Sequence, residues 1–207
     1  MNSRLEAWLD SQPASSVATT RRFLSFLLEA YTCSLDGLVN QPRLNVMGET
    51  GPHSFHFGTP VPDLRTIASW SITHCDNARL LIKVMKKLWK RHGKEDVVMF
   101  SFLVANTNPH IFNCGPWMFF LHVLGDSEAV DDILEVGEEM VRAGHPLPDN
   151  EWIEAMANQS RAWHQYAVLF LAVANDDRTM PVTLLHTAPR GGFMYEKIRI
   201  RLLEGNN

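Results

Sequence analysis

The sequence predicts an all-α fold in which antiparallel helix pairs stack side by side. In one segment after another, apolar residues recur at the 3.6-residue spacing of an amphipathic helix, while the period-two alternation of strands is nearly absent. Short polar breaks separate these segments, and short helices joined by short connections pack as antiparallel neighbours. No strict internal repeat is visible, so an irregular compact helical bundle is the alternative fold.

Bulk composition bounds the class of protein. The 207 residues suit one domain, residues 1–207, because two independent cores would leave each half small. A hydrophobic fraction of 45% beside 20% charged residues is typical of a globular chain. No apolar run approaches the length of a membrane span, and residues 1–20 lack the apolar stretch of a signal peptide. Three widely spaced cysteines predict no disulfide framework, so we expect a cytoplasmic protein without membrane contact.

Residues 1–59 are expected to hold N-terminal helical structure followed by an irregular connection. The first strong helix covers residues 20–32, where Phe23, Leu27 and Tyr31 belong to one apolar stripe. Residues 34–59 contain several prolines and glycines, which favour a structured connection over a regular element. Within that connection, residues 54–57 could form a brief strand.

Residues 60–207 show the regular rhythm of helix pairs. Pro62 suits the first turn of a helix that carries Leu64 and Ile67 on its apolar face. A second helix is expected over residues 78–92, ended by Gly93. Further helices are expected over residues 94–106, 117–124, 127–142, 150–157, 161–174, 181–187 and 193–203.

Positive charge is concentrated in residues 79–94. This stretch contains seven of the chain's 19 basic residues and no acidic residue. At helical spacing most of these cations share one face, while Leu81, Val84, Met85 and Leu88 supply the opposite, buried face. Such a stripe can neutralise nucleic-acid phosphates, although a solvated surface rich in lysine has the same pattern. The residues assigned to the backbone of duplex DNA are Arg79, Lys83, Lys86, Lys87, Lys90 and Lys94.

Negative charge is concentrated in residues 126–139, and the net charge of the chain is −4. Neither observation is typical of a nucleic-acid binder. An acidic helix cannot lie along a phosphate backbone. If the protein binds DNA, one or two of these acids must point into a cleft and the others must face away.

Four motifs, taken in order, resemble the AlkD-like DNA alkylation repair family. Residues 62–65, Pro-Asp-Leu-Arg, resemble that family's Pro-x-Leu-Arg helix start, and Leu88-Trp89 followed by Glu95-Asp96 resembles its Leu-Trp pair and acidic helix start. Residues 162–174 resemble a buried helix near the middle of the family's superhelix. Residues 196–204 resemble its Lys-Ala-Ile…Leu-Arg-Glu helix.

The resemblance implies a right-handed superhelix of HEAT-like helix pairs with a basic concave face. Glycosylase members of the family excise cationic alkylated purines such as 7-methylguanine and 3-methyladenine. In them an aspartate stabilises positive charge developing on the sugar, tryptophans contact the deoxyribose, and an arginine binds phosphate. Stabilisation of a developing charge by a fixed opposite charge is a general source of catalysis.

Carried over to this chain, the family's aspartate falls on Asp131, and the tryptophan of the same segment falls on Ser127. The arginine falls on Gln165. An aromatic or cationic contact could instead come from a neighbouring turn, through Trp163, Arg161 or Trp117. The tryptophan of the last helix falls on Arg201. Only the carboxylate is retained, so the resemblance implies weak or absent base excision. An exposed surface acid and a packing tryptophan remain the alternative interpretations of Asp131 and Trp163. The candidate cleft residues are therefore Asp131, Trp163, Gln165 and Arg201.

Other kinds of site have little support in the sequence. Among nine histidines, His53 and His56 are the one close pair, and no cysteine or acid cluster completes a metal-ligand set beside them. No phosphate-binding glycine loop and no nucleophile elbow is present. We therefore expect no metal and no cofactor. Two functions stay open, a protein that binds duplex DNA and a non-catalytic scaffold whose concave HEAT-like surface binds a protein partner.

Overall fold

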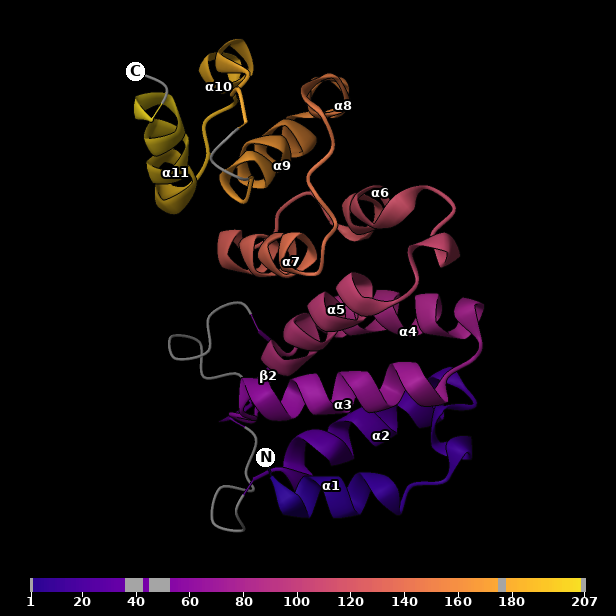
Figure 1. Ribbon diagram of the computed structural model, residues 1–207. Helices are drawn as coiled ribbons and strands as arrows, with labels where there is room; N and C mark the ends of the chain where they lie inside the picture. Colours follow the sequence, from indigo (N-terminus) through magenta and orange to yellow (C-terminus); the bar gives the residue numbers. More distant parts are fainter. Residues whose placement is uncertain (1, 36–42, 45–52, 175–177, 206–207) are drawn as a thin grey trace. The chain divides into compact units, whose positions relative to one another are not determined.

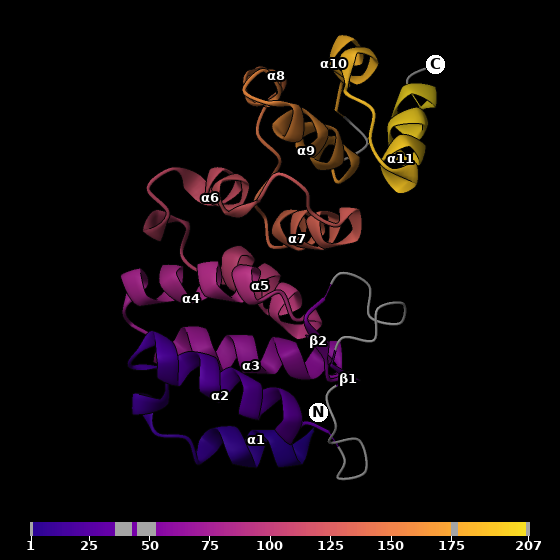
Figure 2. The ribbon, with the colours of Figure 1, turned by 180° about the vertical axis from the view of Figure 1, so that it is seen from behind.

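The computed structural model describes residues 2–35, 43–44, 53–174 and 178–205. Over this part of the chain it confirms the all-α prediction (Figure 1 and, from behind, Figure 2). The chain divides into two compact units, Met1–Ile111 and Phe112–Asn207. The two units are described separately below, and the single-domain organisation of residues 1–207 stays a prediction.

The first unit contains α-helices and one minimal strand pair. The helices are α1 (Ser3–Asp10), α2 (Thr20–Cys33), α3 (Val61–His74), α4 (Ala78–Arg91) and α5 (Lys94–Asn106). Short 3-10 turns cover Ala14–Val17 and Pro109–Ile111. Strand β1 (Arg43–Leu44) pairs antiparallel with β2 (Phe55–His56), which lies where the brief strand was suggested. Much of the predicted connection over residues 34–59 falls outside the described residues.

The sequence did not predict α1. Its N-cap is Asn2, whose side-chain oxygen accepts the backbone N–H of Leu5 at 3.3 Å. Leu5 and Leu9 are the buried residues of this helix. Two apolar positions one turn apart are too few to reveal a helical period in the sequence.

Helix α5 is the most buried helix of the first unit. Residues 95–105 are all buried, and α5 packs against both α3 and α4 (Figure 1). Helix α2 packs against α1 and α4. The largest fully buried side chains of this unit include Phe23, Tyr31, Ile67, Met85 and Phe100. The predicted apolar faces of residues 20–32 and 78–92 are therefore confirmed as core.

A buried polar network fixes the start of α5. The guanidinium of Arg91 donates two hydrogen bonds of 2.6 Å to the carboxylate of Asp96, which also accepts the hydroxyl of Tyr31 at 3.2 Å. Glu95 Oε1 accepts the backbone N–H groups of residues 57, 58 and 59 at 2.9, 2.8 and 3.3 Å. The acidic helix start therefore has a structural role, because it ties α2, the end of α4 and the chain before α3 to α5.

The end of α4 differs from the prediction. His92, not Gly93, adopts the left-handed conformation that ends the helix, with φ 56° and ψ 40°. Gly93 is instead the N-cap of α5. The ring of Phe55 fills the space where a side chain would be, since a Cβ atom on Gly93 would lie 2.1 Å from it. Glycine is therefore required at this position by close packing.

The second unit contains α6 (Gly115–Val123), α7 (Val130–Arg142), α8 (Asn150–Ala157), α9 (Arg161–Ala172), α10 (Val182–Thr187) and α11 (Phe193–Glu204). Its centre is α9, which packs against α7, α8 and α11, while α10 packs against α11. Residues 166–171 of α9 are buried. Phe170 stacks on Phe120 and meets Trp117 edge-on, with ring centroids 5.7 and 5.1 Å apart.

Helix α7 begins three residues later than predicted. Its first residue is Val130, and Ser127 lies in a bend before it. The reason is a local turn in which Glu128 Oε1 accepts the backbone N–H of Gly125 at 2.7 Å. Asp131 and Asp132 then occupy the first helical turn, where negative charge interacts favourably with the helix dipole.

The structure also bears on membrane-spanning helices and on the cysteines. In the part of the chain that the structure describes, no helix combines the length and the apolar character needed to cross a bilayer. Cys33, Cys75 and Cys114 are free thiols. Burial raises the pKa of the Cys75 thiol, so this group is not an activated nucleophile.

Candidate nucleic-acid interface

The solvent side of α4 is a row of cations. Asn77 caps this helix by accepting the backbone N–H of Leu80 at 3.0 Å. Leu81, Val84, Met85 and Leu88 form the buried face, as predicted. At about 100° per residue, the exposed cations cover only about 100° of the helix circumference. We call this set the basic stripe: Arg79, Lys83, Lys86, Lys87 and Lys90.

Two neighbouring cations do not belong to the basic stripe. Arg91 turns towards the core and pairs with Asp96, and its side chain is 24% exposed. Lys94 was assigned to the DNA backbone, but it is half-buried and is the first residue of α5. The seven cations of residues 79–94 therefore separate into five on one exposed face and two at the junction between helices.

The geometry of the basic stripe suits contact with a phosphate backbone. From Arg79 to Lys90 it extends over about 17 Å at 1.5 Å per residue. Arg79, Lys83, Lys87 and Lys90 form no hydrogen bond or ion pair with other described residues. Their charge is therefore available to a ligand. Four of the five cations of the stripe are lysines, whose flexible point charges suit contacts with phosphates.

Asp131, the candidate catalytic carboxylate, is exposed in the first turn of α7. The loop before it is held by α9, because the hydroxyl of Tyr166 donates to the carbonyl of Gly125 at 2.8 Å. Burial, together with the charges of Glu128 and Asp126, raises the pKa of Tyr166 to about 12. The phenol therefore acts as a neutral donor that positions this loop.

The other candidate residues of α9 have structural partners. Trp163 is half-buried, and its ring meets the ring of His122 edge-on at a centroid distance of 5.9 Å. The side-chain amide of Gln165 donates to the carbonyl of Arg190 at 2.8 Å, and Arg161 donates to the same carbonyl at 3.0 Å. The position that matches the family's phosphate-binding arginine thus fixes the loop before α11.

Arg201 is exposed on α11, close to large apolar side chains that are also exposed. Phe193 is 81% exposed, Ile200 48% and Met194 46%. Phe193 and Ile200 line one shallow groove together with Lys197 and Arg201. The opposite side of α11 is packed through Tyr195 and Ile198. We call the exposed side, with Phe193, Met194, Lys197, Ile200 and Arg201, the α11 face.

The four candidate cleft residues form no hydrogen bond, ion pair or ring contact with one another within the described residues. They lie on α7, α9 and α11, and α9 packs against both other helices. The structure therefore places their helices together without assembling their side chains into one site.

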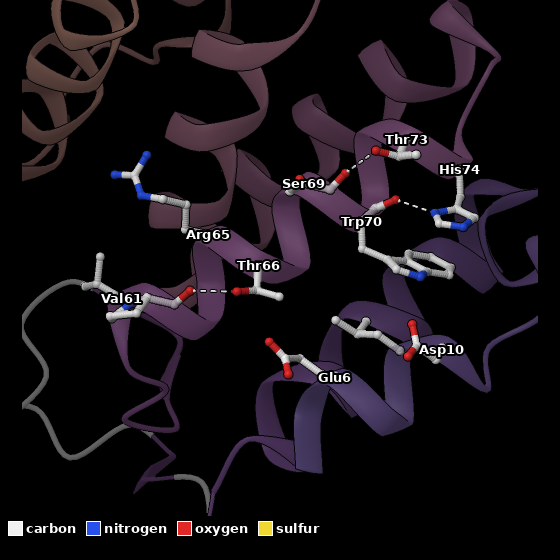
Figure 3. Close-up of a pocket in the computed structure, with 11 residues that line it drawn as sticks. Glu6, Asp10, Val61, Arg65, Thr66, Ser69, Trp70, Thr73 and His74 are labelled. Carbon is white, nitrogen blue, oxygen red and sulfur yellow. Dashed lines mark hydrogen bonds between the residues drawn. The ribbon is translucent and has the colours of Figure 1, made fainter. Parts of the chain in front are cut away.

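A cavity that sequence analysis missed lies between α1 and α3 (Figure 3). Leu9, Val61, Pro62 and Trp70 supply apolar surface, and Trp70 stacks between Phe26 and His74 at centroid distances of 4.7 and 4.0 Å. Glu6 and Asp10 on α1 were not recognised because α1 itself was not predicted. The spacing of Trp70 and His74, four residues apart, was the one available signal. We call this cavity the α1–α3 groove.

No protein-family model, curated protein or solved structure matches the chain. Its function therefore has to be argued from its own side chains.

Proposed function

We propose that this protein binds duplex DNA through the basic stripe of α4, on a fold of stacked HEAT-like helix pairs, with weak or absent base-excision activity. The observation that carries the proposal is the separation of charge on α4. Five cations share one exposed face, the apolar residues share the other, and no acid interrupts the stripe.

The helix contacts within each unit support the fold part of this proposal. Helices next to each other in sequence pack as pairs: α1 with α2, α4 with α5, α8 with α9 and α10 with α11. Alternate helices also pack together: α2 with α4, α3 with α5, α7 with α9 and α9 with α11. Contacts between sequence neighbours and between every second helix are what two stacked rows of helices produce.

The physics of counterion release supports the binding part. Every phosphate that a lysine or arginine neutralises releases condensed cations from the duplex, which is the dominant source of non-specific affinity. The cations of the stripe are exposed, so little desolvation opposes contact. The net charge of −4 weakens long-range attraction to DNA, so local contacts must supply the affinity.

Two observations favour binding over catalysis. Asp131 is exposed, and a carboxylate in water stabilises a developing cation far less than one in a site from which water is excluded. The side-chain amide of Gln165 donates one hydrogen bond to the loop carbonyl of Arg190 and carries no charge, so it is a weak substitute for the family's phosphate-binding arginine. We therefore propose that any excision of 3-methyladenine or 7-methylguanine is slow.

The test compares two variants with the same change in net charge. One carries glutamate at Lys83, Lys86, Lys87 and Lys90. The control carries glutamate at four exposed cations outside α4: Arg21, Arg22, Arg190 and Lys197. We expect the first variant to lose measurable affinity for a fluorescent duplex in an anisotropy titration, while the control binds within a few-fold of the wild type. Equal loss in both variants would refute a specific role for the stripe.

The proposal of weak or absent base excision is tested separately, by measuring released base. The protein is incubated with duplex containing 7-methylguanine, and released base is measured beside an Asp131→Asn variant. We expect release no faster than in the absence of protein. Release that the variant abolishes would replace the binding proposal with a glycosylase.

A second candidate function, a scaffold for a protein partner, is favoured by the α11 face. An aromatic residue with 81% of its surface exposed beside two other exposed apolar residues is typical of an interaction site. Lys197 and Arg201 flank these residues and form no ion pair with described residues, whereas Glu196 is occupied by Arg199 and Gly191. The chemistry fits an acidic amphipathic helix.

This candidate is tested by capturing partners from a nuclease-treated extract. A specific partner should be retained by the wild type and by Val182→Asp, which changes an exposed valine of α10. The same partner should be lost with Phe193→Asp, a change that leaves the helix intact because an acid is favourable at its first position. Retention by both variants would exclude the α11 face as the docking surface.

A further inference from the structure

The α1–α3 groove has the dimensions of a small-ligand site. Its volume is about 600 Å³, within the range that ligand pockets occupy. Apolar surface comes from Leu9 on α1 and from Val61, Pro62 and Trp70 on α3. Trp70 cannot swing out freely, because its ring is stacked between Phe26 and His74. The groove is therefore an apolar trough with a fixed end wall.

The polar groups of the lining are mostly acceptors. Thr66 and Thr73 donate their hydroxyl hydrogens to carbonyls one turn earlier in α3, at 3.1 and 2.9 Å, so each presents oxygen lone pairs outward (Figure 3). His74 Nδ1 lies 2.8 Å from the carbonyl of Trp70. A carbonyl only accepts, so Nδ1 carries a hydrogen and donates it to this carbonyl. The indole N–H of Trp70 and the hydroxyl of Ser69 are the donors that remain.

Two carboxylates give the groove its charge. Glu6 and Asp10 lie one helical turn apart on α1 and point towards α3 (Figure 3). Neither forms a hydrogen bond or ion pair with another described residue. Arg65, the cation of the lining, is directed the other way, with its guanidinium carbon 4.3 Å from the centre of the Phe102 ring. The charge facing the trough is therefore negative.

We propose that the α1–α3 groove binds small aliphatic ammonium compounds, with diamines preferred. An ammonium group has three donors and no acceptor, which matches a lining of carboxylates and hydroxyl lone pairs. Its methylene stem would lie against Leu9, Pro62 and Trp70. Side chains four residues apart on a helix stand about 5–6 Å apart, so Glu6 and Asp10 can each accept one end of a short diamine. This site is independent of the basic stripe and of the DNA proposal.

The experiment is a calorimetric titration of the intact protein with diaminobutane at constant ionic strength. A Glu6→Gln/Asp10→Asn variant keeps side-chain shape and removes both charges. Its control is Asp126→Asn/Glu138→Gln, which removes two exposed charges from the second unit. We expect at least a tenfold loss of affinity in the groove variant, because a hydrogen bond to a charged group contributes more than the 1.4 kcal/mol or so of one tenfold step. The control should change by less than about twofold, as expected for charges remote from the ligand.

Further ligands identify the source of the ammonium group. Butylamine should bind more tightly than ammonium ion if the apolar trough contributes. Diaminobutane binding well above acetyl-lysine amide would indicate a free diamine, whereas equal binding of acetyl-lysine amide and butylamine would indicate a lysine side chain. No binding of any amine, or an equal loss in both double variants, would overturn the proposal. Circular dichroism of each variant verifies that α1 remains folded.

Discussion

The pair formed by Arg91 and Asp96 should be the most sensitive polar contact of the first unit. The carboxylate of Asp96 is completely buried and accepts both hydrogen bonds of the guanidinium, each 2.6 Å long. Burial alone raises the pKa of Asp96, and the hydrogen bonds and charge of Arg91 oppose that shift. Arg91→Met therefore leaves a buried carboxylate with Tyr31 as its one remaining side-chain partner, at 3.2 Å, among the residues that the structure describes.

Removal of one member of a buried ion pair costs about 3–5 kcal/mol, because the other charge is left uncompensated. Arg91 is 24% exposed, so Asp96→Asn, which leaves the guanidinium partly hydrated, should cost less, about 2 kcal/mol. The double variant should be less destabilised than the sum of the two single variants. Lys90→Met is the matched control, since it removes a cation from the exposed face of the same helix.

The assay is urea unfolding followed by circular dichroism, with the denaturant slope compared between variants. Lys90→Met should change the free energy of unfolding by less than about 0.5 kcal/mol, as is usual for an exposed position. In DNA binding the order should reverse, with Lys90→Met weakening affinity and folded Arg91→Met retaining it. If Arg91→Met unfolds no more easily than Lys90→Met, the separation of Arg91 from the basic stripe is wrong.

Two further predictions follow from packing and titration. Gly93→Ala should destabilise the protein by at least about 2 kcal/mol in thermal unfolding, because the added methyl group forces the ring of Phe55 to move. Gly192 is also a helix N-cap but has open space around it, so Gly192→Ala should not destabilise the protein. Burial raises the pKa of all three tyrosines of the chain, to about 12 for Tyr166 and Tyr195 and well above 10 for Tyr31. A phenol whose folded pKa is raised contributes stability that is complete below the unfolded value of 10 and is lost as pH rises towards 12. Ultraviolet titration should therefore show little tyrosinate at pH 10.5 in the folded protein and extensive ionisation in denaturant, and similar curves in both states would contradict the buried positions.

Sequence analysis succeeded where the pattern is long and local. The faces of α4 were predicted because four apolar residues and five exposed cations repeat at one period over fourteen positions. The analysis failed where the role of a residue depends on partners that are distant in the sequence or outside the helix. Nothing local distinguishes Arg91 from Lys90, and only the fold brings Asp96 and Tyr31 to the guanidinium. Helix α7 begins later than predicted because the side chain of Glu128 accepts the backbone N–H of Gly125 and forms a turn there. The spacing of apolar residues does not show that this turn is favoured over an earlier helix start.

The candidate sites also differ in whether a local sequence pattern reveals them. The basic stripe lies on one helix, and all five of its residues were predicted; Lys94 was predicted with them but begins the next helix. The α1–α3 groove needs a short helix with two buried leucines to meet a helix more than fifty residues later, so no local pattern reveals it. The resemblance assigned Gln165 to a cleft, whereas its amide is used by a loop carbonyl that lies 25 positions away in the sequence.

The salt dependence of duplex binding by the unmodified protein tests the central claim most directly. Four or five phosphate contacts from the basic stripe predict that the logarithm of affinity falls linearly with the logarithm of salt concentration, with a slope of about −4. Between 50 and 200 mM salt the affinity should then fall by roughly a few hundredfold, with little dependence on base sequence. Binding that is absent at low salt, or that is insensitive to salt, would contradict the assignment of the stripe to DNA.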